Sequence, residues 1–343
     1  MSRTRSPTDA PLFDRLPDTI VSDIFELTWR NWKCDSSSLW GGIGRFSVPY
    51  ILASVSRRWR TIALSTSRIW RFVELPRRPE LIEDHLARSR SLPLDIDIGL
   101  VWTEDGDKVE DRGADIQESL RILMETNSWA RIEELHSRLN HKQTSLLLAD
   151  FNATIEANPV STVQMINIQP HYTDYGDDDD PIEMFLRIPH SQSLCWVNLE
   201  SVAVSPIPHL PSSPLLGLEQ LEIKDTDVQL SDSLLPLLDL TPNLADLLIE
   251  GCQLLPGMLT AAKPRPRHSL LLSNLETLSL DCTGITGLNM LFQTLDMPDL
   301  KHLSITRVDR GTNIDWDAIC HCHAVEFLIK ILLLWLQFAL DSA

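Results

Sequence analysis

The chain has 343 residues, of which 43% are hydrophobic and 23% charged, and it carries a formal charge of −18. This balance is typical of globular proteins and excludes general disorder. The acidic excess also argues against nucleic acid as a partner, because phosphate binding requires clustered Lys and Arg. It suits a partner with a basic surface, and it equally serves to keep an apolar protein soluble.

Both ends of the chain and its cysteines bear on the compartment. Residues 1–11 (MSRTRSPTDAP) are polar, so we expect a disordered tail there and no secretory signal. The apolar segment 327–340 is short for a membrane span and contains Lys330 and Gln337, which favours a buried helix and no membrane contact. The six cysteines are scattered, unlike the dense framework of a small secreted domain. We therefore expect reduced thiols in the cytoplasm, the nucleus or both.

Helical periodicity starts at Leu16-Pro17-Asp18. Ile20, Ile24 and Leu27 then follow at steps of four and three, which places them with Leu16 on one stripe of a helix. Pro17 suits the first turn, because its missing N–H needs no intrahelical partner there. Asp18 faces the positive end of the helix dipole.

A stretch rich in Ser and Gly at 33–47 predicts a long loop. A second helix is predicted from about Tyr50 to Leu64, and a short apolar segment follows at Ile69-Trp70. The predicted apolar face of this second helix holds Ile51, Val55, Trp59, Ile62 and Ala63.

Four landmarks in this region resemble an F-box. They are Leu16-Pro17-Asp18, Ile24-Phe25, the segment 55–63 (VSRRWRTIA) and Ile69-Trp70, in the order in which that family has them. The amino-acid sequence of these segments is similar to that of F-box-like proteins of mushroom-forming fungi. The resemblance covers residues 12–75, and the loop at 33–47 is longer than is usual in the family.

The resemblance implies a three-helix module that binds the Skp-family adaptor of a cullin–RING ubiquitin ligase. The downstream domain would then recruit the protein to be ubiquitinated. Sequence does not separate the residues that face the adaptor from those that pack the module. The positions that match the motif, and so the candidate adaptor-binding residues, are Leu16, Pro17, Ile20, Ile24, Phe25, Val55, Arg58 and Trp59.

Beyond residue 76 the pattern changes from helix to strand. The segment 92–98 (LPLDIDI) alternates apolar and acidic residues and predicts a half-buried strand. Triplets of the form Leu-x-x-Leu-x-Leu then recur, in which alternate apolar side chains would lie inside a short strand. The clear ones are Leu218-Leu221-Ile223, Leu244-Leu247-Ile249, Leu275-Leu278-Leu280 and Leu300-Leu303-Ile305. The weaker ones are Ile132-Leu135, Val163-Ile166-Ile168, Leu194-Val197-Leu199 and Val325-Leu328.

These triplets begin 24 to 31 residues apart, close to the roughly 20–29-residue period of leucine-rich repeats. Helical patterns at 116–123 and 288–295 lie between predicted strands, and Cys252 occupies a position where the repeat consensus has Asn or Cys. We therefore predict an α/β fold, in which a three-helix F-box (12–75) precedes a leucine-rich-repeat-like solenoid of short parallel strands and helices (76–343). An irregular α/β domain is the alternative.

The sequence contains no signature of catalysis, such as a Gly-x-Ser-x-Gly elbow, a phosphate-binding loop or a His-Glu-x-x-His helix. Cys320-His321-Cys322-His323 is dense in metal-capable side chains, but its spacing differs from that of zinc-binding pairs and no second pair is evident. The acidic run 177–180 lacks the Gly and the terminal Glu of a calcium loop. We expect no catalytic residues, no metal and no cofactor.

The predicted function is that of a substrate receptor, not an enzyme, which links an unidentified target protein to a Skp–cullin–RING ligase. The alternative is a leucine-rich-repeat scaffold outside ubiquitination, with a decayed or repurposed F-box. A hydrolase or a metalloenzyme is the third class considered.

Overall fold

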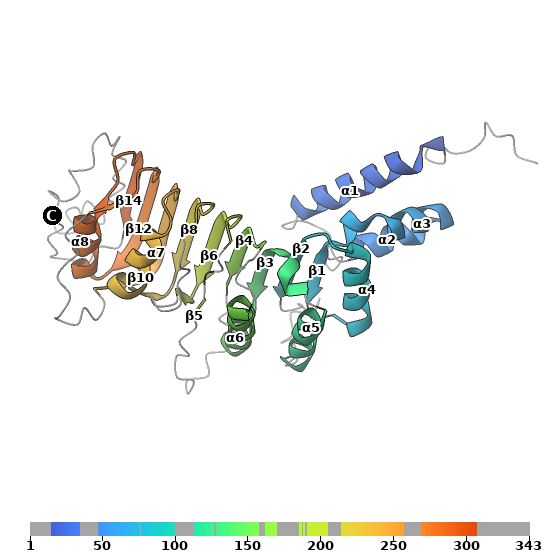
Figure 1. The fold of residues 1–343 in the computed structure, drawn as a ribbon, viewed down its shortest axis with the longest axis horizontal. Helices are drawn as coiled ribbons and strands as arrows, with labels where there is room; N and C mark the ends of the chain where they lie inside the picture. Colours follow the sequence, from blue (N-terminus) through green and yellow to red (C-terminus); the bar gives the residue numbers. More distant parts are fainter. Residues whose placement is uncertain are drawn as a thin grey trace, which may run out of the picture. The chain divides into compact units, whose positions relative to one another are not determined.

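The computed structural model describes residues 15–34, 47–75, 77–99, 113–126, 128–157, 162–169, 185–186, 188, 191–204, 214–256 and 269–306. The chain packs as two compact units, Met1–Ile132 and Glu133–Ala343, each of which is an assembly of helices and parallel strands. The boundary at 75/76 predicted from the sequence stays a prediction. In the first unit the elements are α1 (Asp18–Cys34), α2 (Val48–Val55), α3 (Arg57–Ser65), the 3-10 helix η4 (Ser67–Trp70), β1 (Phe72–Leu75), α4 (Pro79–Ser89), β2 (Leu94–Gly99), α5 (Gly113–Glu125) and the 3-10 helix η5 (Ser128–Arg131) (Figure 1).

The core of the first unit forms between the first three helices and η4. Val21, Phe25 and Trp29 recur every four residues and bury one stripe of α1. Trp70 of η4 is fully buried, and its indole N–H donates to the Ala63 carbonyl at 2.8 Å, so the polar atom of this large side chain is satisfied. The three helices thus bury their apolar faces in a common core.

One predicted helix is two helices. The sequence predicted a continuous helix over 50–64, but Ser56 is extended (φ −156°, ψ 168°) and separates α2 from α3. The Ser56 hydroxyl accepts the backbone N–H of Trp59 at 3.1 Å and so caps the start of α3. Because the chain changes direction at this cap, Val55 is exposed and does not share a buried face with Trp59.

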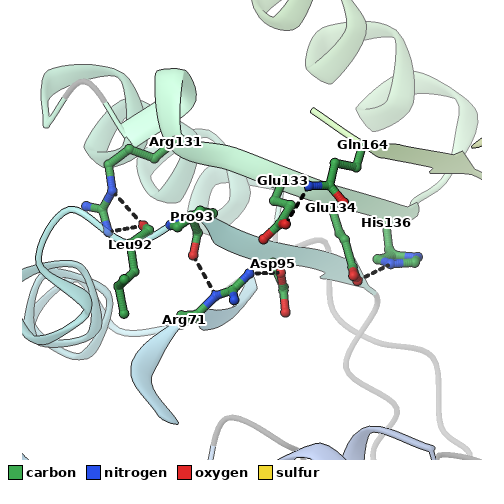
Figure 2. A network of polar contacts seen from close by, with 9 residues as sticks. All are labelled: Arg71, Leu92, Pro93, Asp95, Arg131, Glu133, Glu134, His136 and Gln164. Carbon is green, nitrogen blue, oxygen red and sulfur yellow. Dashed lines mark hydrogen bonds and ion pairs between the residues drawn. The ribbon is translucent and has the colours of Figure 1, made fainter. Parts of the chain in front are cut away.

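The predicted strand at 92–98 is confirmed as β2, which pairs in parallel with β1. The prediction that it is half-buried was wrong at Asp95, which is almost fully buried. The Arg71 guanidinium compensates this buried carboxylate: Nη2 lies 3.3 Å from Asp95 Oδ1, and Nε donates to the Pro93 carbonyl at 2.9 Å (Figure 2). Figure 2 also shows Arg131, which donates to the Leu92 carbonyl at 3.0 and 2.8 Å.

The second unit is built on parallel strands that follow one another in chain order, β3-β4-β6-β8-β10-β12-β14 (Figure 1). Shorter parallel pairs are β5 with β7 and β11 with β13, and β9 pairs with the end of β10. The strands are β3 (Ile132–Arg138), β4 (Met165–Ile168), β5 (Phe185–Leu186), β6 (Trp196–Glu200), β7 (Ala203–Val204), β8 (Gln220–Lys224), β9 (Asp227–Gln229), β10 (Asp246–Leu255), β11 (Leu270–Leu271), β12 (Thr277–Thr283), β13 (Leu295–Asp296) and β14 (His302–Thr306). The helices are α6 (His141–Ala157), the π-helix η7 (Leu230–Leu234), α7 (Leu235–Asp239) and α8 (Ile285–Thr294).

The predicted triplets form the inner face of this sheet. Their middle residues are Cα partners from strand to strand and are all buried: Leu135, Ile166, Val197, Leu221, Leu247, Leu278 and Leu303. The last apolar residue of each complete triplet is buried beside them. The helical pattern at 116–123 is confirmed within α5, and that at 288–295 is confirmed in α8 up to Thr294, while Leu295 begins β13. The eighth triplet, at 325–328, lies outside the described residues. The fold is thus α/β with a mainly parallel sheet.

Left-handed backbone recurs at the same position of three successive strands of this sheet: β6 and β8 end there, and β10 shifts its register there. Ser201 (φ 53°), Asp225 (φ 49°) and Gly251 (φ 65°) directly follow Glu200, Lys224 and Glu250, which are Cα partners. A Cβ on Gly251 would lie only 2.1 Å from Asp225 Oδ1. Gly251 is therefore required both by its φ angle and by the adjacent side chain.

Candidate functional site

The helices of the first unit also carry apolar side chains that the core does not bury. On α1 the residues that periodicity placed on one stripe are those turned outward: Ile20 is 43% exposed, Leu27 58%, and Ile24 is half-buried. Val55 (58%) and Ile51 are exposed on α2, four residues apart and therefore on one side of that helix. Ile20, Ile24, Leu27, Ile51 and Val55 are called the outer apolar residues below.

The structure divides the candidate adaptor-binding residues into three groups. Pro17, Ile20 and Val55 are exposed and available to a partner. Phe25 is a core residue at 1% exposed, and Trp59 and Leu16 are half-buried and pack against the same core. Ile24 and Arg58 are half-buried.

Arg58 ties the start of α3 to the start of α1. Its guanidinium donates to Asp18 Oδ1 through Nε at 2.9 Å and Nη2 at 2.6 Å, and Nη2 also donates to the Leu16 carbonyl. The Ser22 and Thr66 hydroxyls form a second link, 2.8 Å apart, between α1 and the end of α3. The two hydrogen bonds from Arg58 to Asp18 are charge-assisted, and such bonds fix the geometry of the groups that they join. Arg58 thus holds the Leu16-Pro17 segment in place.

A depression of about 390 Å³ lies beside α2 in the same unit. It is lined by Ser47, Tyr50, Ile51, Ser54, Arg77 and Leu81. Its lining is mainly apolar with a few polar groups, which suits insertion of a side chain from a protein partner. Burial, together with the nearby Asp84 carboxylate, raises the pKa of Tyr50 to about 12, so the phenol stays protonated at neutral pH.

The outer face of the parallel sheet in the second unit is polar. The residues between the two inner apolar positions of each strand form one row: His136, Asn167, Asn198, Glu222, Leu248, Ser279 and Ser304. The residues two positions before them form another: Glu134, Met165, Trp196, Gln220, Asp246, Thr277 and His302.

Side chains in these rows are joined by hydrogen bonds across the strands. Asn198 Nδ2 donates to Asn167 Oδ1 at 3.1 Å, and Asn167 Nδ2 lies 3.4 Å from His136 Nδ1. His136 Nε2 in turn lies 3.6 Å from Glu134 Oε2 (Figure 2). The Trp196 indole N–H donates to Glu222 Oε1 at 3.1 Å. This ladder keeps the polar side chains in fixed orientations.

The outer face is also strongly acidic. Alternation along the strands brings six carboxylates to it against two cations, Arg138 and Lys224, a formal charge of −4. Burial raises the pKa of Glu200. The neighbouring carboxylates of Asp225 and Glu250 act in the same direction, and Lys224 acts against them. The carboxylates are Glu134, Glu200, Glu222, Asp246, Glu250 and Asp281.

Neither a metal centre nor a membrane helix is found in the part of the chain that the structure describes. The sequence candidates for metal binding, 177–180 and 320–323, and the apolar segment 327–340 lie outside that part. Cys195, Cys252 and Cys282 are free thiols. Burial raises the pKa of Cys252 to about 11 and that of Cys282 to about 12, so neither is a thiolate at neutral pH.

Trp196, Asn198 and Glu222 were not identified from the sequence, because only the apolar residues of each triplet were considered. The available signal was the identity of the residues between those apolar residues, since alternation in a strand sends them to the opposite face. A scan against protein-family models and a search of curated proteins give no match to this chain.

Proposed function

We propose that the chain is an F-box substrate receptor, in which α1, α2 and α3 bind the Skp-family adaptor of a cullin–RING ubiquitin ligase. The observation that carries this proposal is the exposure of the outer apolar residues on helices whose other faces already form a core. Exposed apolar side chains gathered on a small helical unit are typical of a surface that binds a protein partner. The protein would work in the cytoplasm, the nucleus or both.

We further propose that the second unit is a leucine-rich-repeat solenoid whose outer sheet face recruits the target protein. Support comes from the in-register ladder of buried apolar residues and from left-handed residues at the same place in three successive units. In such a solenoid each unit contacts only its neighbours and the polar side of the strands forms an extended binding surface. Ubiquitin transfer would belong to the assembled ligase, through proximity.

The test is binding of purified full-length protein to a purified Skp-family adaptor. Ile20→Glu and Val55→Glu change exposed side chains, so the fold should survive while a charge enters an apolar contact. Each variant should weaken adaptor binding by about tenfold or more. Leu146→Glu is the matched control, because Leu146 is a comparably exposed leucine on α6 of the other unit.

Thermal unfolding of all three variants checks that they remain folded. Adaptor binding by Ile20→Glu and Val55→Glu equal to that of Leu146→Glu would contradict the proposal. Failure of the parent protein to bind any Skp-family adaptor would favour the scaffold alternative.

A further inference from the structure

Asn198 is a buried polar side chain with an acceptor that the fold does not use. It is only 3% exposed, and its Nδ2 donates to Asn167 Oδ1. Its Oδ1 has no hydrogen-bond partner among the residues that the structure describes. A buried acceptor without a donor is unfavourable, and a donor supplied by a bound ligand would remove that cost.

Two carboxylates and an indole neighbour Asn198 on the same face of the sheet. Glu222 follows it in the same row; its Oε1 accepts from the Trp196 indole and its Oε2 lies 2.8 Å from Lys224 Nζ. Glu200 lies two residues further along β6 on the same face. Asn198 therefore has a carboxylate beside it on β8, a second carboxylate two residues after it on β6 and an indole ring two residues before it, all on the same face.

One chemical group matches all of these. A guanidinium carries five N–H donors in a plane, so it can bond a carboxylate and an amide oxygen together, and it stacks on an indole face. An ammonium group offers a point charge without the plane, and it fits a carboxylate pair but gains less from the tryptophan.

We propose that the outer sheet face at Asn198 binds an arginine side chain of an extended segment of the target protein. The guanidinium takes the place of the Trp196 indole N–H at Glu222. Once the indole has moved, the guanidinium also donates to Asn198 Oδ1, which is buried in the unbound protein. The released indole then stacks on the guanidinium. The formal charge of −4 on this face favours approach of a basic segment. The inference rests on one part of the proposed function, namely that the outer sheet face recruits the target protein.

The experiment measures peptide binding to the purified full-length protein by fluorescence anisotropy at about 50 mM salt, where charge screening is weak. The probe is a labelled Gly/Ser peptide that contains three arginines. Two matched peptides carry lysine or citrulline in their place. The arginine peptide should bind, the lysine peptide should bind about tenfold more weakly, and the uncharged citrulline peptide should not bind.

Three variants locate the site. Glu222→Gln and Asn198→Ala should each weaken the arginine peptide by about tenfold, the worth of one charge-assisted hydrogen bond. Asp246→Asn is the control, because it removes an equal charge from the same face on β10, two strands from Asn198. It should change binding by less than about threefold. Thermal unfolding confirms that each variant is folded.

Three results would overturn the inference: no binding of the arginine peptide up to about 1 mM, equal binding of the lysine peptide, or equal losses in Asp246→Asn and Glu222→Gln. The last result would mean diffuse charge attraction without a site. Adaptor binding is measured on the same Glu222→Gln protein and should be unchanged. If the parent protein binds the adaptor but not the arginine peptide, this inference alone fails. If it binds the arginine peptide but no adaptor, the proposed function alone fails.

Discussion

The Trp59 indole packs against the phenyl ring of Phe25, with ring centroids 4.9 Å apart and ring planes inclined by 58°. This tilted contact joins α3 to α1 inside the core of the first unit. It is the kind of aromatic geometry that adds to the free energy gained from burial alone. Trp59, like Phe25, is therefore first of all a packing residue, although both belong to the segments that resemble an F-box.

Phe25→Ala should lower the free energy of unfolding of the first unit by about 3–5 kcal/mol, because it removes a fully buried ring and its contact with Trp59. Leu27→Ala, two residues along the same helix at an exposed position, should change it by less than about 0.5 kcal/mol. Urea unfolding of the full chain, followed by circular dichroism, measures both. Similar losses in the two variants would show that the buried stripe of α1 is misassigned.

Leu247→Ala, Leu278→Ala and Leu303→Ala should each destabilise the second unit by about 2–5 kcal/mol, since each side chain fills the interior next to the partner on the adjacent strand. Leu248→Ala is a matched control, because Leu248 is the next residue of β10 but lies half-exposed on the outer face. Its loss should be clearly smaller. The measurement is urea unfolding of the full chain, and losses below about 1 kcal/mol at all three inner sites would contradict the ladder.

Gly251→Ala should destabilise the second unit for two separable reasons. The positive φ angle costs about 1–2 kcal/mol for any residue with a Cβ, and the new methyl group would collide with Asp225 Oδ1. In an Asp225→Ala background the collision is removed and only the cost of the φ angle remains. A double-mutant cycle by urea unfolding measures the difference. Equal costs of Gly251→Ala in both backgrounds would show that the Asp225 carboxylate plays no part.

Stability should depend on His85 at acidic pH. His85 is buried, which lowers its pKa to about 3, while the hydrogen bond of Nδ1 with the Phe72 carbonyl at 3.1 Å opposes the shift. Between pH 6.5 and about 3 the unfolded chain binds a proton that the folded chain does not. The contribution to stability is therefore present above pH 6.5 and is lost as the pH falls, by up to about 1.4 kcal/mol per pH unit.

His85→Gln removes this titration and leaves the carboxylates of the chain unchanged. From pH 7 to pH 5 the parent should lose about 2 kcal/mol more than the variant. Urea unfolding of both proteins at the two pH values gives the difference directly. Parallel losses in parent and variant would mean that His85 titrates in the folded protein as it does in the unfolded chain.

The strands of the second unit could be predicted because alternation is a local property of the sequence. Leu221 and Ile223, with one residue between them, indicate a buried face whatever surrounds the strand, and the structure buries both. The same reasoning fails at Asp95, which is buried. Alternation predicts partial exposure of its carboxylate, but Arg71, 24 residues away, allows it to be buried.

The helices of the first unit were harder to predict because α1 is apolar on two sides. Periodicity selected the stripe of Ile20 and Leu27, whereas the core is built from Val21 and Phe25 on the other side. Only the packing of the other helices decides which stripe is covered. The break at Ser56 could have been found, since a serine three residues before the amide it caps is a start signal for a helix.

The contact of Asp225 with the backbone at Gly251 also restricts how this chain could have grown by duplication. If residues 220–245 were copied in tandem, the copy of Asp225 would occupy the place that Gly251 holds now. Its Cβ would then lie 2.1 Å from Oδ1 of the original Asp225, so that this carboxylate would have to move. A tandem copy of this unit would therefore fit only if the Asp225 side chain at the junction changed its rotamer or its identity.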